Sequence, residues 1–126
     1  MATIKSYTDL EQSKKLAEIL PIESADMHYA TWTILDGEFI VSPDQGDTIE
    51  SLQEDYGNQI IPCWSLAALL DILPYPQLSK DKLGSVKVGW IVSVYPNGCR
   101  YDSCWHDNPV DACYEIIIKL NELKLL

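Results

Sequence analysis

The sequence lacks positive charge over half of its length, because no lysine or arginine occurs between Leu16 and Ser79. The same stretch carries eleven acidic residues, so its charge is −11 with its histidine neutral. All nine basic residues and eight further acidic ones lie elsewhere, so the net charge of −10 comes from this segment. A field of one sign acts on partners more than on the fold. It argues against nucleic acid, anionic membranes and acidic substrates as direct ligands of the segment.

Apolar segments for export or membrane insertion are also lacking. The first fifteen residues contain no apolar stretch typical of a secretory signal. The strongest apolar runs, near Leu66–Leu73 and Ile116–Ile118, are too short to cross a bilayer. We therefore expect a cytoplasmic protein whose cysteines are free, mostly buried thiols, because disulfides need an oxidising compartment. The four cysteines are Cys63, Cys99, Cys104 and Cys113.

Known phosphate-binding and nucleophile motifs are missing as well. Neither G-x-G-x-x-G nor G-x-x-x-x-G-K occurs, and Ser65 and Ser103 lack the glycines that flank a nucleophilic serine. Asp44, Asp47 and Glu50 could offer oxygen ligands to calcium, but their order does not match an EF-hand loop. Solvated loop charge is the preferred interpretation, and the sequence predicts no metal and no cofactor.

The composition is that of an ordinary globular protein, with 47% hydrophobic and 22% charged residues in 126. This length predicts one domain over residues 1–126. Its predicted class is α+β, with a small antiparallel sheet packed by three main helices.

The first half of the chain predicts two helices and a hairpin. Thr8 and Glu11 form a capping box for a helix over Asp9–Leu20, which Pro21 ends. Strands over Met27–Leu35 and Phe39–Val41 flank Asp36-Gly37, a dipeptide suited to a tight turn. A short helix is expected over Thr48–Tyr56.

The second half predicts a buried helix, a hairpin and a last helix. Pro62 can start a helix over Cys63–Leu73, and its nearly continuous apolar surface predicts burial on most sides. Tyr75–Ser85 is expected to be a loop. A core-facing stripe marks the last helix, which has Asn108 as N-cap and Pro109 as first residue. The stripe comprises Cys113, Ile116, Ile117, Leu120 and Leu123.

Apolar residues occupy every second position of Val86–Tyr95, which predicts a strand, and a second strand is expected over Cys99–Trp105. Two turns are possible at Pro96-Asn97-Gly98. A two-residue Asn97-Gly98 turn would place Trp105 opposite Trp90, whereas a type I turn from Pro96 would make Gly98 a bulge. The first register is preferred because its facing pairs are more apolar.

Three runs of the sequence are distinctive together: YTDLEQSKKLAEILPIESADM, IPCWSLAALLDILPYPQLSKDKLG and WHDNPVDACYEIIIKLNELKLL. They resemble a family of short uncharacterised proteins from gut bacteria and their mobile elements. The likeness is weaker over Thr31–Gln59, where most of the acidic loop charge lies. It implies no activity and no catalytic residue, but a mobile-element origin favours a protein that acts on another protein.

One cluster of residues, Cys99–Asp107, contains groups found in reactive sites. Cys99 and Cys104 are five apart, so an unbulged strand would point them to opposite faces and exclude a shared metal or a disulfide. Cys104 and His106 would share a face, and a thiolate–imidazole pair oriented by Asp107 is the weak catalytic candidate. Buried cysteines beside a surface histidine are the preferred interpretation.

The leading functional prediction is a non-catalytic protein that binds another protein, one whose surface is basic. The predicted interaction surface consists of Asp36, Glu38, Asp44, Asp47, Glu50, Glu54 and Asp55. One alternative is an inhibitor that mimics DNA and occupies a basic nucleic-acid groove. Another is an enzyme that uses Cys104, His106 and Asp107. The oligomeric state is left open.

Overall fold

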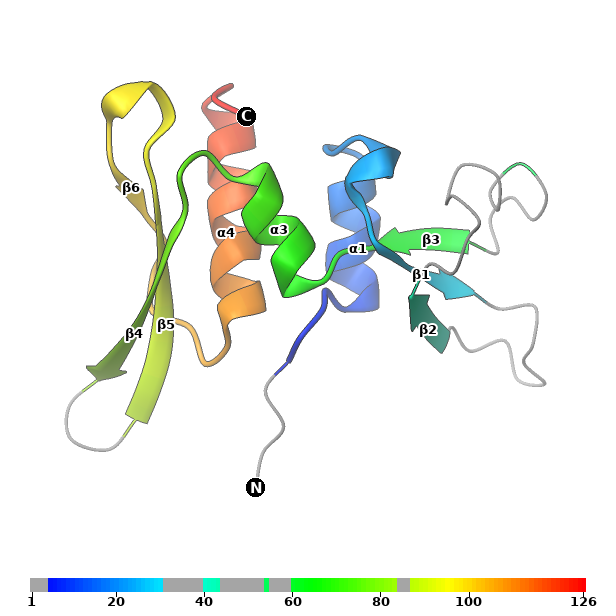
Figure 1. The fold of residues 1–126 in the computed structure, drawn as a ribbon, viewed down its shortest axis with the longest axis horizontal. Helices are drawn as coiled ribbons and strands as arrows, with labels where there is room; N and C mark the ends of the chain where they lie inside the picture. The colour runs from blue at the N-terminus through cyan, green and yellow to red at the C-terminus, as the bar shows by residue number, and fades with distance from the viewer. Residues whose placement is uncertain (1–4, 31–39, 44–53, 55–59, 84–86) are drawn as a thin grey trace. The chain divides into compact units, whose positions relative to one another are not determined.

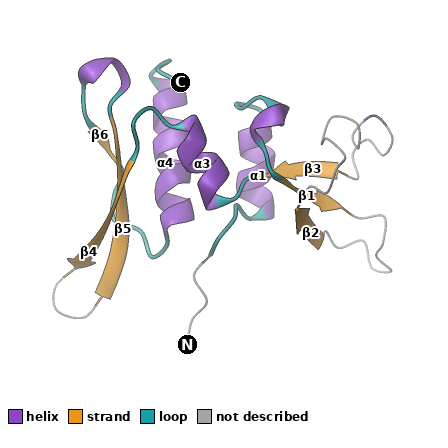
Figure 2. Cartoon of the chain, viewed as in Figure 1, coloured by secondary structure: helices purple, strands orange, loops and turns teal. Residues whose placement is uncertain are grey.

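A computed structural model describes residues 5–30, 40–43, 54, 60–83 and 87–126 (Figure 1). The chain divides into two compact units. We call Tyr7–Ala68 the acidic unit, because it holds twelve acidic and two basic residues and has a net charge of −10. Met1–Ser6 and Leu69–Leu126 form the neutral unit, with seven residues of each sign. Helices and antiparallel strands occur together, which confirms the predicted α+β class (Figure 2).

Helix α1 of the acidic unit, Leu10–Ala17, begins one residue later than predicted. Its N-cap is Asp9, whose side chain accepts the Gln12 N–H at 2.8 Å, while the Gln12 side chain accepts the Asp9 N–H. The predicted capping box of Thr8 and Glu11 is therefore wrong. Thr8 is completely buried, and its hydroxyl is bonded within the core instead. A short 3₁₀ turn, η1 (Ile22–Ser24), follows the helix.

Strand β1, Met27–Ala30, is the centre of a three-stranded antiparallel sheet. β2, Ile40–Pro43, pairs antiparallel with one side of β1, so the two predicted strands are neighbours, but Ala30 pairs with Ile40 rather than with Pro43 as a two-residue Asp36-Gly37 turn would require. The predicted turn at Asp36-Gly37 lies outside the described residues. So does the predicted helix Thr48–Tyr56, apart from Glu54. On its other side β1 pairs with β3, Ile60–Cys63, which forms an edge of the sheet.

The predicted helix over Cys63–Leu73 is wrong in its first part. Pro62 and Cys63 belong to β3, and proline is tolerated there because β3 is an edge strand. Helix α3 covers only Leu66–Ile72. Of its residues Leu69 alone is fully buried, so the predicted burial on most sides is also wrong.

The neutral unit has a second sheet, in the order β4–β5–β6, and helix α4. Strand β4, Gln77–Leu83, replaces the predicted loop and pairs along β5, Lys87–Val94. The sequence gives no strand signal for β4, because an edge strand can be polar and rich in lysine. Two sheets thus take the place of the single predicted sheet.

The turn after β5 confirms the preferred register at its start. Asn97 and Gly98 have φ angles of 56° and 80°, as a two-residue type I′ turn needs, within the 3₁₀ segment η3 (Pro96–Gly98). Val94 then pairs with Tyr101 of β6, Tyr101–Asp102.

Helix α4, Pro109–Glu122, begins as predicted, with Asn108 accepting the Asp111 N–H at 2.8 Å. Its predicted stripe is buried except for Leu123, which lies beyond the last helical residue and is 48% exposed. Val92 and Val94 of β5 are completely buried in the same unit. Across the described residues, no helix combines the length and apolar character needed to cross a membrane.

Candidate functional site

A β-bulge occupies the predicted Cys99–Asp107 cluster in the neutral unit. Ser93 pairs with Asp102, whereas Trp90 pairs with His106, so the register shifts by one residue between these two pairs. The Ser103 N–H still donates to the carbonyl of Val92 at 2.9 Å, while the Ser103 hydroxyl accepts the Val92 N–H in place of a backbone carbonyl. Two residues, Cys104 and Trp105, therefore oppose one residue of β5.

The bulge places Trp105 over Gly89 instead of opposite Trp90 as predicted. A Cβ atom on Gly89 would lie 1.9 Å from Cε2 of the Trp105 indole, so only glycine leaves room for the ring. The indole Nε1 is buried and has no hydrogen-bond partner. The Lys80 ammonium instead lies 5.5 Å from the centroid of the Trp90 ring. This is a cation–π contact between paired residues of β4 and β5.

Glu115 of α4 holds both residues that flank Trp105. One carboxylate oxygen lies 2.8 Å from His106 Nε2, and the other accepts the Cys104 N–H at 2.9 Å. Burial by itself raises the pKa of the Glu115 carboxyl, but these two hydrogen bonds outweigh burial and hold the pKa below its usual value. The carboxylate thus ties the bulge to α4 and fixes the segment that positions Trp105.

The weak catalytic candidates are not brought together as a triad. The shared face of Cys104 and His106 was predicted for an unbulged strand, and the register shift between the Ser93–Asp102 and Trp90–His106 pairs shows that the strand is bulged there. Within the described part of the chain, no hydrogen bond joins the Cys104 thiol to His106, and the partner of His106 is Glu115 rather than Asp107. This arrangement provides an ordered bulge rather than an activated nucleophile.

The four cysteines divide evenly by exposure. Cys99 and Cys104 are exposed, so the predicted burial of the cysteines in the Cys99–Asp107 cluster is wrong, whereas Cys63 and Cys113 are buried. Burial raises the pKa of the Cys113 thiol to about 12 and raises the pKa of Cys63 as well. Both buried thiols therefore stay protonated at neutral pH and are poor nucleophiles. No three histidine, cysteine or acidic side chains gather as metal ligands among the residues that the structure describes.

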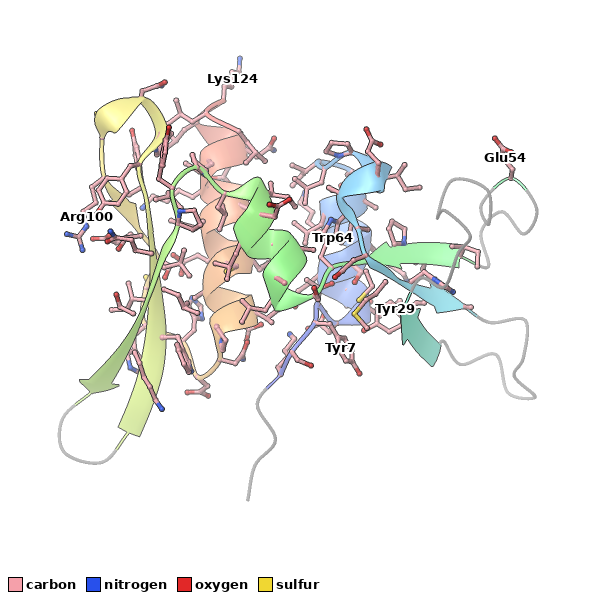
Figure 3. The ribbon with its side chains drawn as sticks, in the orientation of Figure 1. Tyr7, Tyr29, Glu54, Trp64, Arg100 and Lys124 are labelled. Atoms are coloured by element: carbon pink, nitrogen blue, oxygen red, sulfur yellow. The ribbon has the colours of Figure 1, made fainter. Side chains whose placement is uncertain are left out.

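The acidic unit has its own buried polar cluster, made of uncharged groups. The Thr8 hydroxyl lies 2.7 Å from Ser13 Oγ and 3.5 Å from Cys63 Sγ, and it accepts the Trp64 N–H at 3.2 Å. The Tyr29 hydroxyl donates to the carbonyl of Thr8 at 2.8 Å. Burial raises the pKa of Tyr29, whose side chain is labelled in Figure 3, so this hydroxyl stays neutral. The cluster joins α1, β1 and β3 and has a structural role.

Charge on the acidic unit lies on its surface. Six acids of this unit are described, and all six are exposed: Asp9, Glu11, Glu18, Glu23, Asp26 and Glu54. Glu54 projects away from the ribbon (Figure 3). Of the predicted interaction surface, Glu54 is the member described, and Asp36, Glu38, Asp44, Asp47, Glu50 and Asp55 lie outside the described residues.

Sequence reasoning missed Glu115 as a member of the cluster. Nothing in its spacing from His106 signals a contact, because the two residues meet only when α4 packs beside the bulge. The Trp105–Gly89 contact has a weak sequence signal, since an isolated glycine in a strand pattern can mark a close approach.

No family model, curated protein or solved structure matches the chain.

Proposed function

We propose that the protein is a non-catalytic binding module whose acidic unit recognises a protein with a basic surface. The observation that carries the proposal is the division of charge: −10 on one unit and zero on the other. Structural needs do not explain this imbalance, because the buried polar cluster of the acidic unit is uncharged. A surface with an excess of acids speeds the encounter with a basic partner and suppresses binding to acidic ones.

The predicted footprint is the segment from Asp36 to Asp55, which has seven acids in twenty residues. The described acids of the unit support the footprint because they are exposed, and Glu54 belongs to it. A resemblance to proteins of mobile elements agrees with a role in acting on another protein. A partner with a nucleic-acid groove would make the protein a DNA mimic, and a partner without one would exclude that form of the proposal.

Affinity capture from the native host at low and high salt, followed by mass spectrometry, tests the proposal. We expect one or a few basic proteins to be retained at low salt and released at high salt, because screening weakens surface charge pairs. A variant with Asp44→Asn, Asp47→Asn and Glu50→Gln should lose these proteins. Retention that is insensitive to both salt and the variant would contradict the proposal.

A further inference from the structure

The turn between β5 and β6 exposes a chemically labile pair of residues, Asn97 and Gly98. It belongs to the neutral unit and lies at the end of the strand pair (Figure 1). An asparagine that precedes glycine can lose its side-chain amide without an enzyme, because the next backbone nitrogen can attack the amide carbon. Glycine leaves this nitrogen accessible, since it carries no Cβ atom. The turn therefore contains the reactants for a modification that the chain performs on itself.

The surroundings of Gly98 are open. A Cβ atom on Gly98 would meet no heavy atom of the described residues within 4 Å, its chain neighbours apart. The Cys99 N–H donates to the carbonyl of Pro96 at 3.2 Å, and Val94 pairs with Tyr101 where the strands begin. The turn is therefore held from its base, so its tip can open while the strands stay paired.

The backbone of the closed turn controls when the attack can occur. Asn97 has a φ angle of 56° and a ψ angle of 24°. At this ψ angle the Cα–Cβ bond of Asn97 points away from the Gly98 nitrogen, so the amide carbon reaches that nitrogen only after rotation about the Cα–C bond. This rotation opens the turn, and local opening of an exposed turn needs less free energy than global unfolding. The opening of the turn therefore sets the rate of the reaction.

Two other asparagines of the neutral unit provide a contrast. Asn108 precedes Pro109, which has no N–H to attack with, and the Asn108 side chain is bonded to Asp111 as the cap of α4. Asn121 lies within α4, where the helical backbone holds the next nitrogen away from the side chain. The unit thus contains its own controls for the reaction.

We propose that Asn97 is a site of spontaneous deamidation and that the change alters the β5–β6 turn. In the first step the Gly98 nitrogen forms a bond to the side-chain carbonyl carbon of Asn97. The carbon–nitrogen bond of the amide breaks, and ammonia leaves with the proton from the Gly98 N–H, which gives a cyclic succinimide. Water then adds to either carbonyl carbon of the ring and opens it to aspartate or isoaspartate. Nothing is oxidised or reduced, and water is the co-reactant.

The two products differ in their effect on the turn. Aspartate keeps the backbone, and Asp-Gly fits a type I′ turn as Asn-Gly does. Isoaspartate routes the chain through the former side chain and adds one carbon to the backbone, so a two-residue turn no longer fits the pairing of Val94 with Tyr101. The following residues lead into the bulge that positions Trp105, so isoaspartate should also change the surroundings of that indole. These effects do not depend on the proposed function, because they concern the other unit.

Ageing of the purified full-length chain at mildly alkaline pH tests the proposal. Peptide mass spectrometry should show replacement of NH2 by OH at Asn97 about tenfold or more faster than at Asn108 or Asn121, because neither of these has an accessible N–H after it. A methyltransferase specific for isoaspartate should label the peptide around position 97 in the wild type but not in Asn97→Gln, whose longer side chain forms the ring poorly. The same chain in denaturant should react faster at Asn97, because the turn is absent.

Two variants separate the products from general ageing. Fresh Asn97→Asp should keep the melting temperature and tryptophan fluorescence of fresh wild type, whereas wild type enriched in isoaspartate at position 97 should melt about 4 °C lower. Asn97→Gln should melt at the same temperature before and after ageing. Wild type that stays unmodified at Asn97, or reacts equally at the three asparagines, would overturn the proposal. Equal rates in the folded and denatured chain would refute control by the turn, and an unchanged melting temperature would refute the effect on it.

Discussion

The two units of this chain handle charge in opposite ways. In the neutral unit, acids are matched with bases: Lys5–Asp111 at 2.9 Å, Arg100–Asp102 at 2.8 Å and His106–Glu115 at 2.8 Å. In the described part of the acidic unit there is one ion pair, Lys15–Glu18, at 3.6 Å between exposed side chains. Such a pair contributes about 0–1 kcal/mol to stability.

This difference separates charge that supports the fold from charge available to a partner. In the neutral unit, Glu115 accepts a hydrogen bond from the bulge, and Asp111 binds Lys5 in the segment before α1. These two acids therefore stabilise the fold. The acidic unit instead joins its elements through hydroxyl groups and a thiol around Thr8. Asp9 and Asp26 also make structural hydrogen bonds there, and the net charge of −10 on this unit is the basis of the proposed function.

The largest expected effect is in the core of the acidic unit. Thr8→Val removes the hydroxyl that accepts the Trp64 N–H and bonds Ser13, and leaves buried donors unpaired. We expect a loss of about 3 kcal/mol in the free energy of unfolding. Thr8→Ser keeps the hydroxyl and should cost about 1 kcal/mol, for the lost methyl group. Denaturant unfolding measures both variants, and equal losses would show that the hydroxyl is unimportant.

The next effect is at the bulge of the neutral unit. Gly89→Ala places a Cβ atom where the Trp105 indole lies, and should destabilise the protein by about 2 kcal/mol. In a Trp105→Ala background the same substitution should cost less than about 0.5 kcal/mol, because the ring is gone. A double-mutant cycle measured by thermal unfolding checks this coupling, and additive losses would refute the contact.

The smallest effect is the pH dependence of the Glu115 contact. The folded-state pKa of Glu115 is lowered, so its stabilisation is fully present above the unfolded-state pKa and is lost as the pH falls through the folded-state pKa. Glu115→Gln should cost about 1 kcal/mol near neutral pH and progressively less at acidic pH. Asp107→Asn, an exposed change just before the same helix, is the control and should leave the unfolding profile unchanged. A constant cost of Glu115→Gln at every pH would contradict this assignment.

Local signals in the sequence predicted α4, β5 and the Asn97-Gly98 turn, because a cap, an alternating pattern and a turn dipeptide each act over a few residues. Local signals gave wrong predictions where two of them competed. Thr8 and Asp9 can each cap the first helix, and Pro62 can start a helix or lie in an edge strand. Local signals also failed where the deciding contact is distant in sequence. The bulge, the Trp105–Gly89 contact and the Glu115 carboxylate all depend on tertiary packing that no spacing reveals.

The most direct test of the account compares two pairs of charge-neutralising substitutions in the same binding titration. Glu50→Gln with Glu54→Gln removes two charges from the acidic unit, and Asp71→Asn with Asp107→Asn removes two from the neutral unit. The affinity for a captured basic protein, measured as a function of salt, should fall and lose part of its salt dependence only for the first pair. Equal losses for both pairs would contradict the claim that the charge of the acidic unit serves recognition.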